Sequence, residues 1–179
     1  AVPATKEYDE DCDSSAAIVL DTRVRDGAAH ARSGQIDELE AVVSLCASVA
    51  FTINESHFID LLLVGREQHE FRGWPRESRP DRIHELLAVV EPSRAEPGRP
   101  TIMALTDRLQ EMSRVVFILL DWTETYRHLV ELAERAGSHC TVVLVGDPVA
   151  ARKHPIRTWV GTARTLAPQE ILSGQVKQL

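Results

Sequence analysis

The chain has 179 residues, a hydrophobic content of 44% and a formal net charge of −7 at pH 7. This length suits a single domain with a sizeable core, and no apolar run approaches the roughly 20 residues of a membrane span. The negative charge argues against a dedicated nucleic-acid-binding protein, because such proteins depend on cations that neutralise phosphates. We therefore expect one globular domain over residues 1–179. Because the sequence begins without methionine, we expect it to be a fragment of a longer protein.

The first half of the chain predicts strands and a long helix in alternation. The run Ala16–Leu20 is wholly apolar and predicts a buried strand that ends at Asp21. A helix with wide apolar coverage is expected over Gln35–Asn54. The segment His57–Gly65 then predicts a second buried strand, and the polar segment Glu67–Gly73 predicts a short strand at the edge of the sheet.

The second half continues the same alternation. Strands that are apolar along their whole length are typical of a parallel sheet that is covered on both faces. We therefore expect an α/β fold: a three-layer α/β/α sandwich of Rossmann type, with a mostly parallel central sheet and one antiparallel edge strand. The further expected elements are helices over Asp81–Val90, Thr101–Met112 and Glu124–Ala136, strands over Val115–Asp121, His139–Asp147 and Thr162–Leu166, and a short helix over Pro168–Gly174.

Two of the expected core strands end in an aspartate, at Asp21 and Asp121, and Thr101 opens a helix between them. In open α/β sheets, ligands bind outside the carboxyl ends of the strands, so these residues are candidates for a functional site. The order of elements, together with this Asp, Thr and Asp, resembles the von Willebrand factor A fold. The resemblance implies a metal-ion-dependent adhesion site, in which a DxSxS loop, a later Thr and a later Asp bind Mg²⁺.

Three further stretches are similar to the C-terminal half of an uncharacterised bacterial protein family that is often encoded beside MoxR-type AAA+ ATPases. They are TKEYDED at 5–11, LEAVVSLCASVAFTI at 39–53 and ILSGQVKQL at 171–179. This resemblance implies a protein partner, with a MoxR-type AAA+ ATPase as the candidate, and no nucleic acid. It also implies a cytoplasmic domain whose full-length protein is tethered to the inner membrane by an upstream segment, so that this fragment itself makes no membrane contact.

Arg23 and Arg25 occupy the positions of the two serines in the DxSxS pattern. Mg²⁺ prefers small oxygen ligands, whereas arginine has no acceptor atom and carries a permanent charge. We therefore expect a degenerate adhesion site that takes no metal or other cofactor, with Mg²⁺ binding as the less favoured alternative. The guanidinium of an arginine would lie between the two carboxylates in place of the ion. In the simplest interpretation, Asp21 and Asp121 are only capping or salt-bridged residues.

Two functions from different classes remain open. The first is a non-catalytic protein–protein interaction domain, with Asp21, Arg23, Arg25, Thr101 and Asp121 as its binding residues. The alternative is an enzyme that binds a small molecule or a phosphate at the same strand ends, with Arg23 and Arg25 holding the anion. We favour the non-enzymatic function, because the sequence contains no nucleophile elbow, P-loop or dinucleotide fingerprint.

Overall fold

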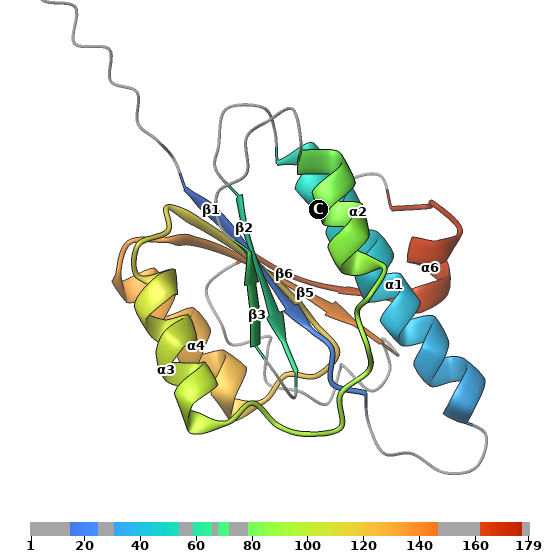
Figure 1. Cartoon of the computed structure of the whole chain (residues 1–179), viewed down its shortest axis with the longest axis horizontal. Helices are drawn as coiled ribbons and strands as arrows, with labels where there is room; N and C mark the ends of the chain where they lie inside the picture. The colour runs from blue at the N-terminus through green and yellow to red at the C-terminus, as the bar shows by residue number, and fades with distance from the viewer. Residues whose placement is uncertain are drawn as a thin grey trace, which may run out of the picture.

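The computed structural model describes residues 15–24, 31–53, 59–65, 68–71, 79–146 and 162–176. Within this part of the chain, one twisted sheet is covered by helices on both faces (Figure 1). Its strands are β1 (Ala16–Asp21), β2 (Ile59–Val64), β3 (Gln68–Phe71), β4 (Arg114–Leu119), β5 (His139–Val145) and β6 (Thr162–Leu166). Its helices are α1 (Ala31–Thr52), α2 (Arg79–Leu87), α3 (Arg99–Leu109), α4 (Glu124–Arg135) and α6 (Pro168–Leu172).

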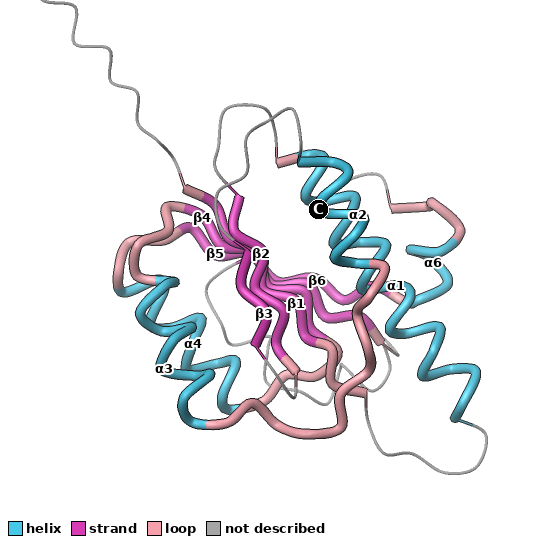
Figure 2. Tube along the Cα trace, viewed as in Figure 1, coloured by secondary structure: helices cyan, strands magenta, loops and turns pink. Residues whose placement is uncertain are grey.

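The strand order is β3-β2-β1-β4-β5-β6. The five strands β2, β1, β4, β5 and β6 run parallel to one another. Strand β3, at the edge, pairs with β2 in the antiparallel sense. Figure 2 shows the sheet as a central layer, with α3 and α4 on one face and α1, α2 and α6 on the other. This arrangement confirms the expected α/β architecture with a parallel central sheet.

The sheet separates two hydrophobic clusters. Successive residues of a strand point to opposite faces. On β1, Ala17 and Val19 therefore pack in the cluster under α3 and α4, whereas Ile18 and Leu20 pack in the cluster under α1. All four side chains are buried. The burial of both faces explains why this strand is a continuous apolar run rather than an alternation of apolar and polar residues.

The bounds of α4 follow local signals in the sequence. The side chain of Thr123 accepts a hydrogen bond from the backbone N–H of Tyr126, at 3.4 Å, and so caps the first turn. Gly137 follows the last turn with a φ of 97°, a conformation that glycine adopts without strain. The observed helix ends one residue before the expected Glu124–Ala136.

Two helices begin earlier than expected. Helix α3 starts at Arg99 rather than Thr101, because Gly98 is the N-cap and Pro100 suits the first turn of a helix. Helix α1 starts at Ala31, four residues before the expected Gln35. In the described part of the chain, we find no helix with both the length and the apolar character needed to cross a membrane.

Candidate functional site at the carboxyl ends of the strands

The order of the strands brings Asp21 and Asp121 to the same edge of the sheet. Strand β1 pairs with β2 on one side and with β4 on the other, both in parallel. Strands β2 and β3 therefore lie on one side of β1, and strands β4, β5 and β6 lie on the other. In open α/β sheets, a crevice forms at the carboxyl ends of the strands at such a topological switch point. Asp21 is the last residue of β1, and Asp121 lies two residues beyond the end of β4.

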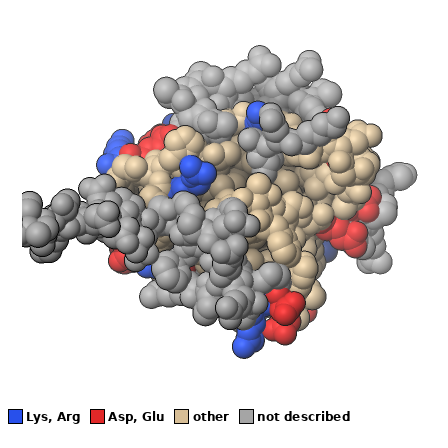
Figure 3. Space-filling model, turned by 90° about the horizontal axis from the view of Figure 1, so that it is seen from above, with Lys and Arg blue, Asp and Glu red and all other residues tan. Residues whose placement is uncertain are grey.

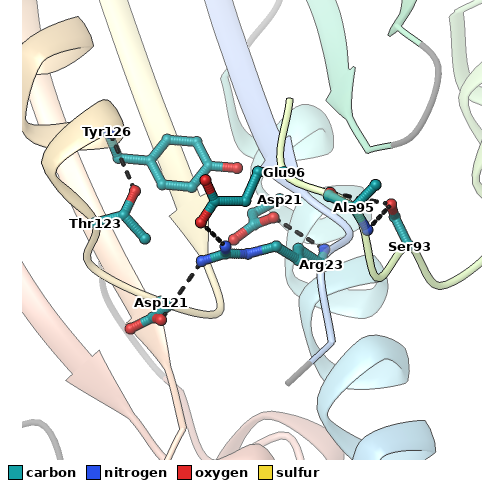
Figure 4. Close-up of polar contacts among 8 residues, drawn as sticks. All are labelled: Asp21, Arg23, Ser93, Ala95, Glu96, Asp121, Thr123 and Tyr126. Atoms are coloured by element: carbon teal, nitrogen blue, oxygen red, sulfur yellow. Dashed lines mark hydrogen bonds and ion pairs between the residues drawn. The ribbon is translucent and has the colours of Figure 1, made fainter. Parts of the chain in front are cut away.

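The loop between α2 and α3 is fastened to the segment that follows β1. The backbone N–H of Ser93 donates to the Thr22 carbonyl at 2.8 Å, and the N–H of Val24 donates to the Ser93 carbonyl at 2.9 Å. Arg23 and Ser93 thus form a parallel bridge outside the main strands. This bridge carries the rest of the loop, including Glu96, to the side of Arg23 (Figure 4).

The guanidinium of Arg23 lies between two carboxylates at this edge. Its Nη1 donates to Glu96 Oε1 at 2.6 Å, and its Nη2 lies 3.5 Å from Asp121 Oδ2. The Arg23 side chain is 16% exposed, against 73% for Glu96 and 23% for Asp121. We call Asp21, Arg23, Glu96 and Asp121 the crest cluster. An arginine does lie between two acids, as the sequence suggested, but the second acid is Glu96 rather than Asp21.

Asp21 lies beneath this ion pair and is fully buried. Its Oδ1 accepts the backbone N–H of Arg23 at 2.9 Å. Burial raises the pKa of Asp21 to about 6, although the contact with Arg23 and the nearby Tyr126 hydroxyl oppose the rise. Burial, together with the neighbouring Asp21, also raises the pKa of Tyr126 well above its usual range.

Asp21 Oδ2 and the Tyr126 hydroxyl make no hydrogen bond of standard geometry within the described part of the chain. Figure 4 nevertheless shows the Tyr126 ring directed toward the Asp21 side, where the hydroxyl influences the carboxylate. A buried polar atom without a hydrogen bond costs free energy. Asp21 Oδ2 and the Tyr126 hydroxyl therefore destabilise the folded state at the base of the crest cluster.

The structure brings some of the predicted site residues together and separates others. Asp21, Arg23 and Asp121 gather at one point, and the ion pair to Asp121 agrees with the salt-bridge interpretation. Thr101 is partly exposed in the first turn of α3, and among the described residues it makes no hydrogen bond to either aspartate. Arg25 lies outside the described residues.

Sequence reasoning did not find Glu96 or Tyr126. Glu96 lies in a loop of proline, glycine and charged residues, and its pairing with Arg23 spans 73 positions of the sequence. Tyr126 lies within the expected helix Glu124–Ala136, and it was not among the predicted site residues. No signal in the sequence pointed to Glu96; in the structure, the five N–H donors of the mostly buried Arg23 side chain can serve more than one carboxylate.

The crest cluster does not provide a ligand set for Mg²⁺. A hard divalent cation needs several oxygen ligands in near-octahedral geometry. Here the Arg23 guanidinium contacts Asp121, and one oxygen of Asp21 is already engaged by a backbone N–H. Asp21 Oδ2 is a buried acceptor that has no hydrogen-bond partner among the described residues. Within the described residues, no group of three or more His, Cys, Asp or Glu side chains is arranged to hold a metal ion.

Solved structures with the same arrangement of strands and helices are von Willebrand factor A domains. A von Willebrand factor type A protein from Catenulispora acidiphila aligns over 90% of this chain and 41% of its own, with a TM-score of 0.59 and 11% identity. The SpRpn10 VWA domain aligns over 92% of this chain and 95% of its own, with a TM-score of 0.54 and 12% identity. The fold is that of a von Willebrand factor A domain.

The manganese-loaded TRAP protein of Plasmodium vivax also shares this fold, with a TM-score of 0.53 and 12% identity over 90% of this chain and 72% of its own. No protein-family model and no curated protein matches the sequence. At these identities the likeness concerns the von Willebrand factor A fold alone.

Proposed function

We propose that this von Willebrand factor A-like domain is a non-catalytic protein–protein interaction module that presents its crest cluster to an acidic surface of a partner. The observation that carries the proposal is the position of Arg23, whose guanidinium lies between Glu96 and Asp121 at the carboxyl ends of the strands. The guanidinium offers directed N–H donors, so a partner carboxylate that takes the place of Glu96 would be held in a defined orientation.

The proposed interaction uses no divalent ion. Arg23 neutralises Asp121 directly and has no acceptor atom with which to bind a cation. Asp21 is fully buried, so its carboxylate is out of reach of a substrate and acts as a support for the loop through the Arg23 backbone. The burial of Asp21 also favours a non-catalytic role, because a catalytic carboxylate has to reach the reacting atoms.

Glu96 is the group that a partner displaces. Its side chain is 73% exposed, whereas the Arg23 side chain that it covers is 16% exposed. An arginine binds a carboxylate through directed, charge-assisted hydrogen bonds, and an acidic side chain of a partner can take the same place as Glu96. Glu96 therefore shields the cation in the free domain and competes with the partner for it.

The candidate partner is a MoxR-type AAA+ ATPase, on the strength of the sequence resemblance to a family encoded beside such ATPases. The same resemblance supports a cytoplasmic position for the domain, with the full-length protein tethered to the inner membrane by a segment outside this chain. The SpRpn10 and Catenulispora structures carry no weight for the choice of partner, since their likeness is one of fold.

Binding of the chain to a purified MoxR-type ATPase tests the proposal, with Arg23→Gln and Glu96→Gln as the variants. We expect Arg23→Gln to weaken binding about tenfold, and Glu96→Gln to strengthen it, because the competing carboxylate is lost. The control Arg135→Gln removes an exposed arginine at the end of α4 and leaves binding unchanged. Equal affinity of wild type and Arg23→Gln would contradict the role of the crest cluster.

Two solution measurements separate this function from the alternatives. Thermal melting with and without millimolar Mg²⁺ should give the same midpoint, because an ion that binds the folded state raises the melting temperature by mass action. Calorimetric titration with nucleotides and inorganic phosphate should show no binding. Micromolar affinity that is lost in Arg23→Gln would favour a phosphate-binding enzyme instead.

A further inference from the structure

A second candidate site lies at the end of the sheet where the strands begin, away from the crest cluster. It is a cavity of about 480 Å³ between α1, α6 and the sheet. Figure 2 shows α1 and α6 together on this face of the sheet. One wall comes from α1, the floor comes from the first residues of β4 and β5, and the other wall comes from α6 and the residues that follow it. This volume falls in the usual range of pockets for small molecules, about 300–1,000 Å³.

The interior of the cavity is apolar. Leu45 and Val49 lie one turn apart on α1, Val116 lies on β4, and Ile171 lies on α6. All four belong to the same buried hydrophobic cluster. A ligand that enters the cavity therefore meets aliphatic side chains from three elements, which favours an apolar body.

The rim of the cavity carries an arginine and a histidine. Arg114 and His139 are the first residues of β4 and β5, and they are direct neighbours in the register of these parallel strands. Both line the cavity and both are exposed. Within the described part of the chain, neither side chain forms an ion pair or a hydrogen bond. An arginine with five free donors beside an imidazole is suited to an anion.

Hydroxyl groups complete the rim. The Ser48 hydroxyl donates to the Ser44 carbonyl at 3.0 Å, so its hydrogen is already used by the helix. The Ser44 and Thr141 hydroxyls have no such partner among the residues that the structure describes, and both line the cavity. Figure 3 shows the molecule from above the view of Figure 1, where uncharged atoms of the described residues lie between separate basic and acidic groups. An arginine without an ion pair among the described residues, beside an apolar cavity, favours an anionic ligand.

We propose that this cavity binds a single-chain amphiphile with an anionic headgroup. The headgroup, a carboxylate or a phosphate monoester, accepts hydrogen bonds from Arg114 and His139, and the alkyl chain lies against Leu45, Val49 and Ile171. The site is independent of the proposed protein partner, because it lies at the opposite end of the sheet from Arg23. Either function can fail without the other.

Calorimetric titration of the whole chain tests the site, with decanoate, decyl phosphate and decanol as probes below their micellar concentrations. We expect the two anions to bind and decanol to bind at least about tenfold more weakly, because charge-assisted hydrogen bonds to the headgroup are lost. The anion that binds with the higher affinity identifies the headgroup. Absence of binding by both anions, or equal binding by decanol, overturns the proposal.

Two variants locate the binding. Arg114→Gln should weaken decanoate about tenfold and leave decanol unchanged, whereas the control Arg135→Gln, on the far layer, should bind as wild type. Ser48→Leu fills the cavity from an exposed position of α1 with a good helix former, so the fold should persist while both anions lose affinity. Wild-type binding in Arg114→Gln and Ser48→Leu alike would place the ligand elsewhere and overturn the assignment.

Discussion

Glu96 Oε1 lies 2.6 Å from Arg23 Nη1, although the two residues are 73 positions apart in the sequence. The bridge between Arg23 and Ser93 makes this contact possible, because it fixes the loop before α3 against the end of β1. The exposed acid thus covers a cation that is mostly buried. In the free domain, the Arg23 guanidinium is therefore already paired with carboxylates of the crest cluster.

The contact itself should contribute little to stability. We expect Glu96→Gln to lower the free energy of unfolding by less than about 1 kcal/mol, as is usual for a pair with one exposed partner. Arg23→Gln should cost more, because Arg23 also contacts Asp121. Urea denaturation of the two single variants and the double variant gives the coupling energy. A larger loss for Glu96→Gln than for Arg23→Gln would contradict this order.

A second ion pair should matter more for folding. Arg108 on α3 donates from Nε to Asp60 Oδ2 at 2.6 Å, and Asp60 on β2 is buried. We expect Arg108→Gln to cost about 3 kcal/mol, because it removes a cation that donates hydrogen bonds to a buried carboxylate. Asp60→Asn should cost less, since the Arg108 side chain is 22% exposed and can turn to water. Denaturant unfolding of both variants checks the order, and Arg82→Gln, in an exposed pair on α2, serves as the control.

Asp21 should make the protein less stable as the pH rises. Its pKa of about 6 in the folded state lies above the ordinary value of 3.8, so the folded protein binds this proton more tightly than the unfolded chain. The stabilisation is full below about pH 4 and is lost as the pH rises through 6. At pH 7, the free energy of unfolding of Asp21→Asn should therefore be about 1–3 kcal/mol higher than that of wild type.

The pH dependence distinguishes this effect from a general change in packing. At pH 4 the advantage of Asp21→Asn should vanish, because wild-type Asp21 is then protonated. Asp107→Asn, an exposed position on α3, should behave as wild type at both pH values. Guanidinium denaturation between pH 4 and 8 measures the difference. A constant offset across this range would show that Asp21 does not titrate as described.

Gly65 permits the close approach of the loop to the end of β2. A Cβ at this position would meet the Thr22 hydroxyl and would lie 3.2 Å from Ser93 Cβ. We expect Gly65→Ala to destabilise the protein by about 1–3 kcal/mol, because Thr22 and Ser93 are both buried and have little room to move. At Gly146 a Cβ meets no atom of the described residues within 4 Å, so Gly146→Ala should be neutral or stabilising by up to about 1 kcal/mol. Thermal melting of the two variants checks the contrast.

Much of the fold was predictable from the sequence. Apolar runs such as Ala16–Leu20 are local signals of a strand that is buried on both faces, and the caps at Thr123 and Gly137 set the bounds of α4. Such signals depend on residues that are near in sequence. The predicted start of α3 was wrong by two residues, because the N-cap residue Gly98 has no side chain that would mark it in the sequence.

The crest cluster was predictable only in part. Local strand signals predicted Asp21 and Asp121 at the ends of parallel strands, and the resemblance to the DxSxS pattern put arginine at the positions of the two serines. The pairing of Glu96 with Arg23 and the approach of Tyr126 to Asp21 became visible only in the folded chain. These contacts depend on how loops and helices from distant parts of the chain pack over the sheet, and no local pattern records that packing.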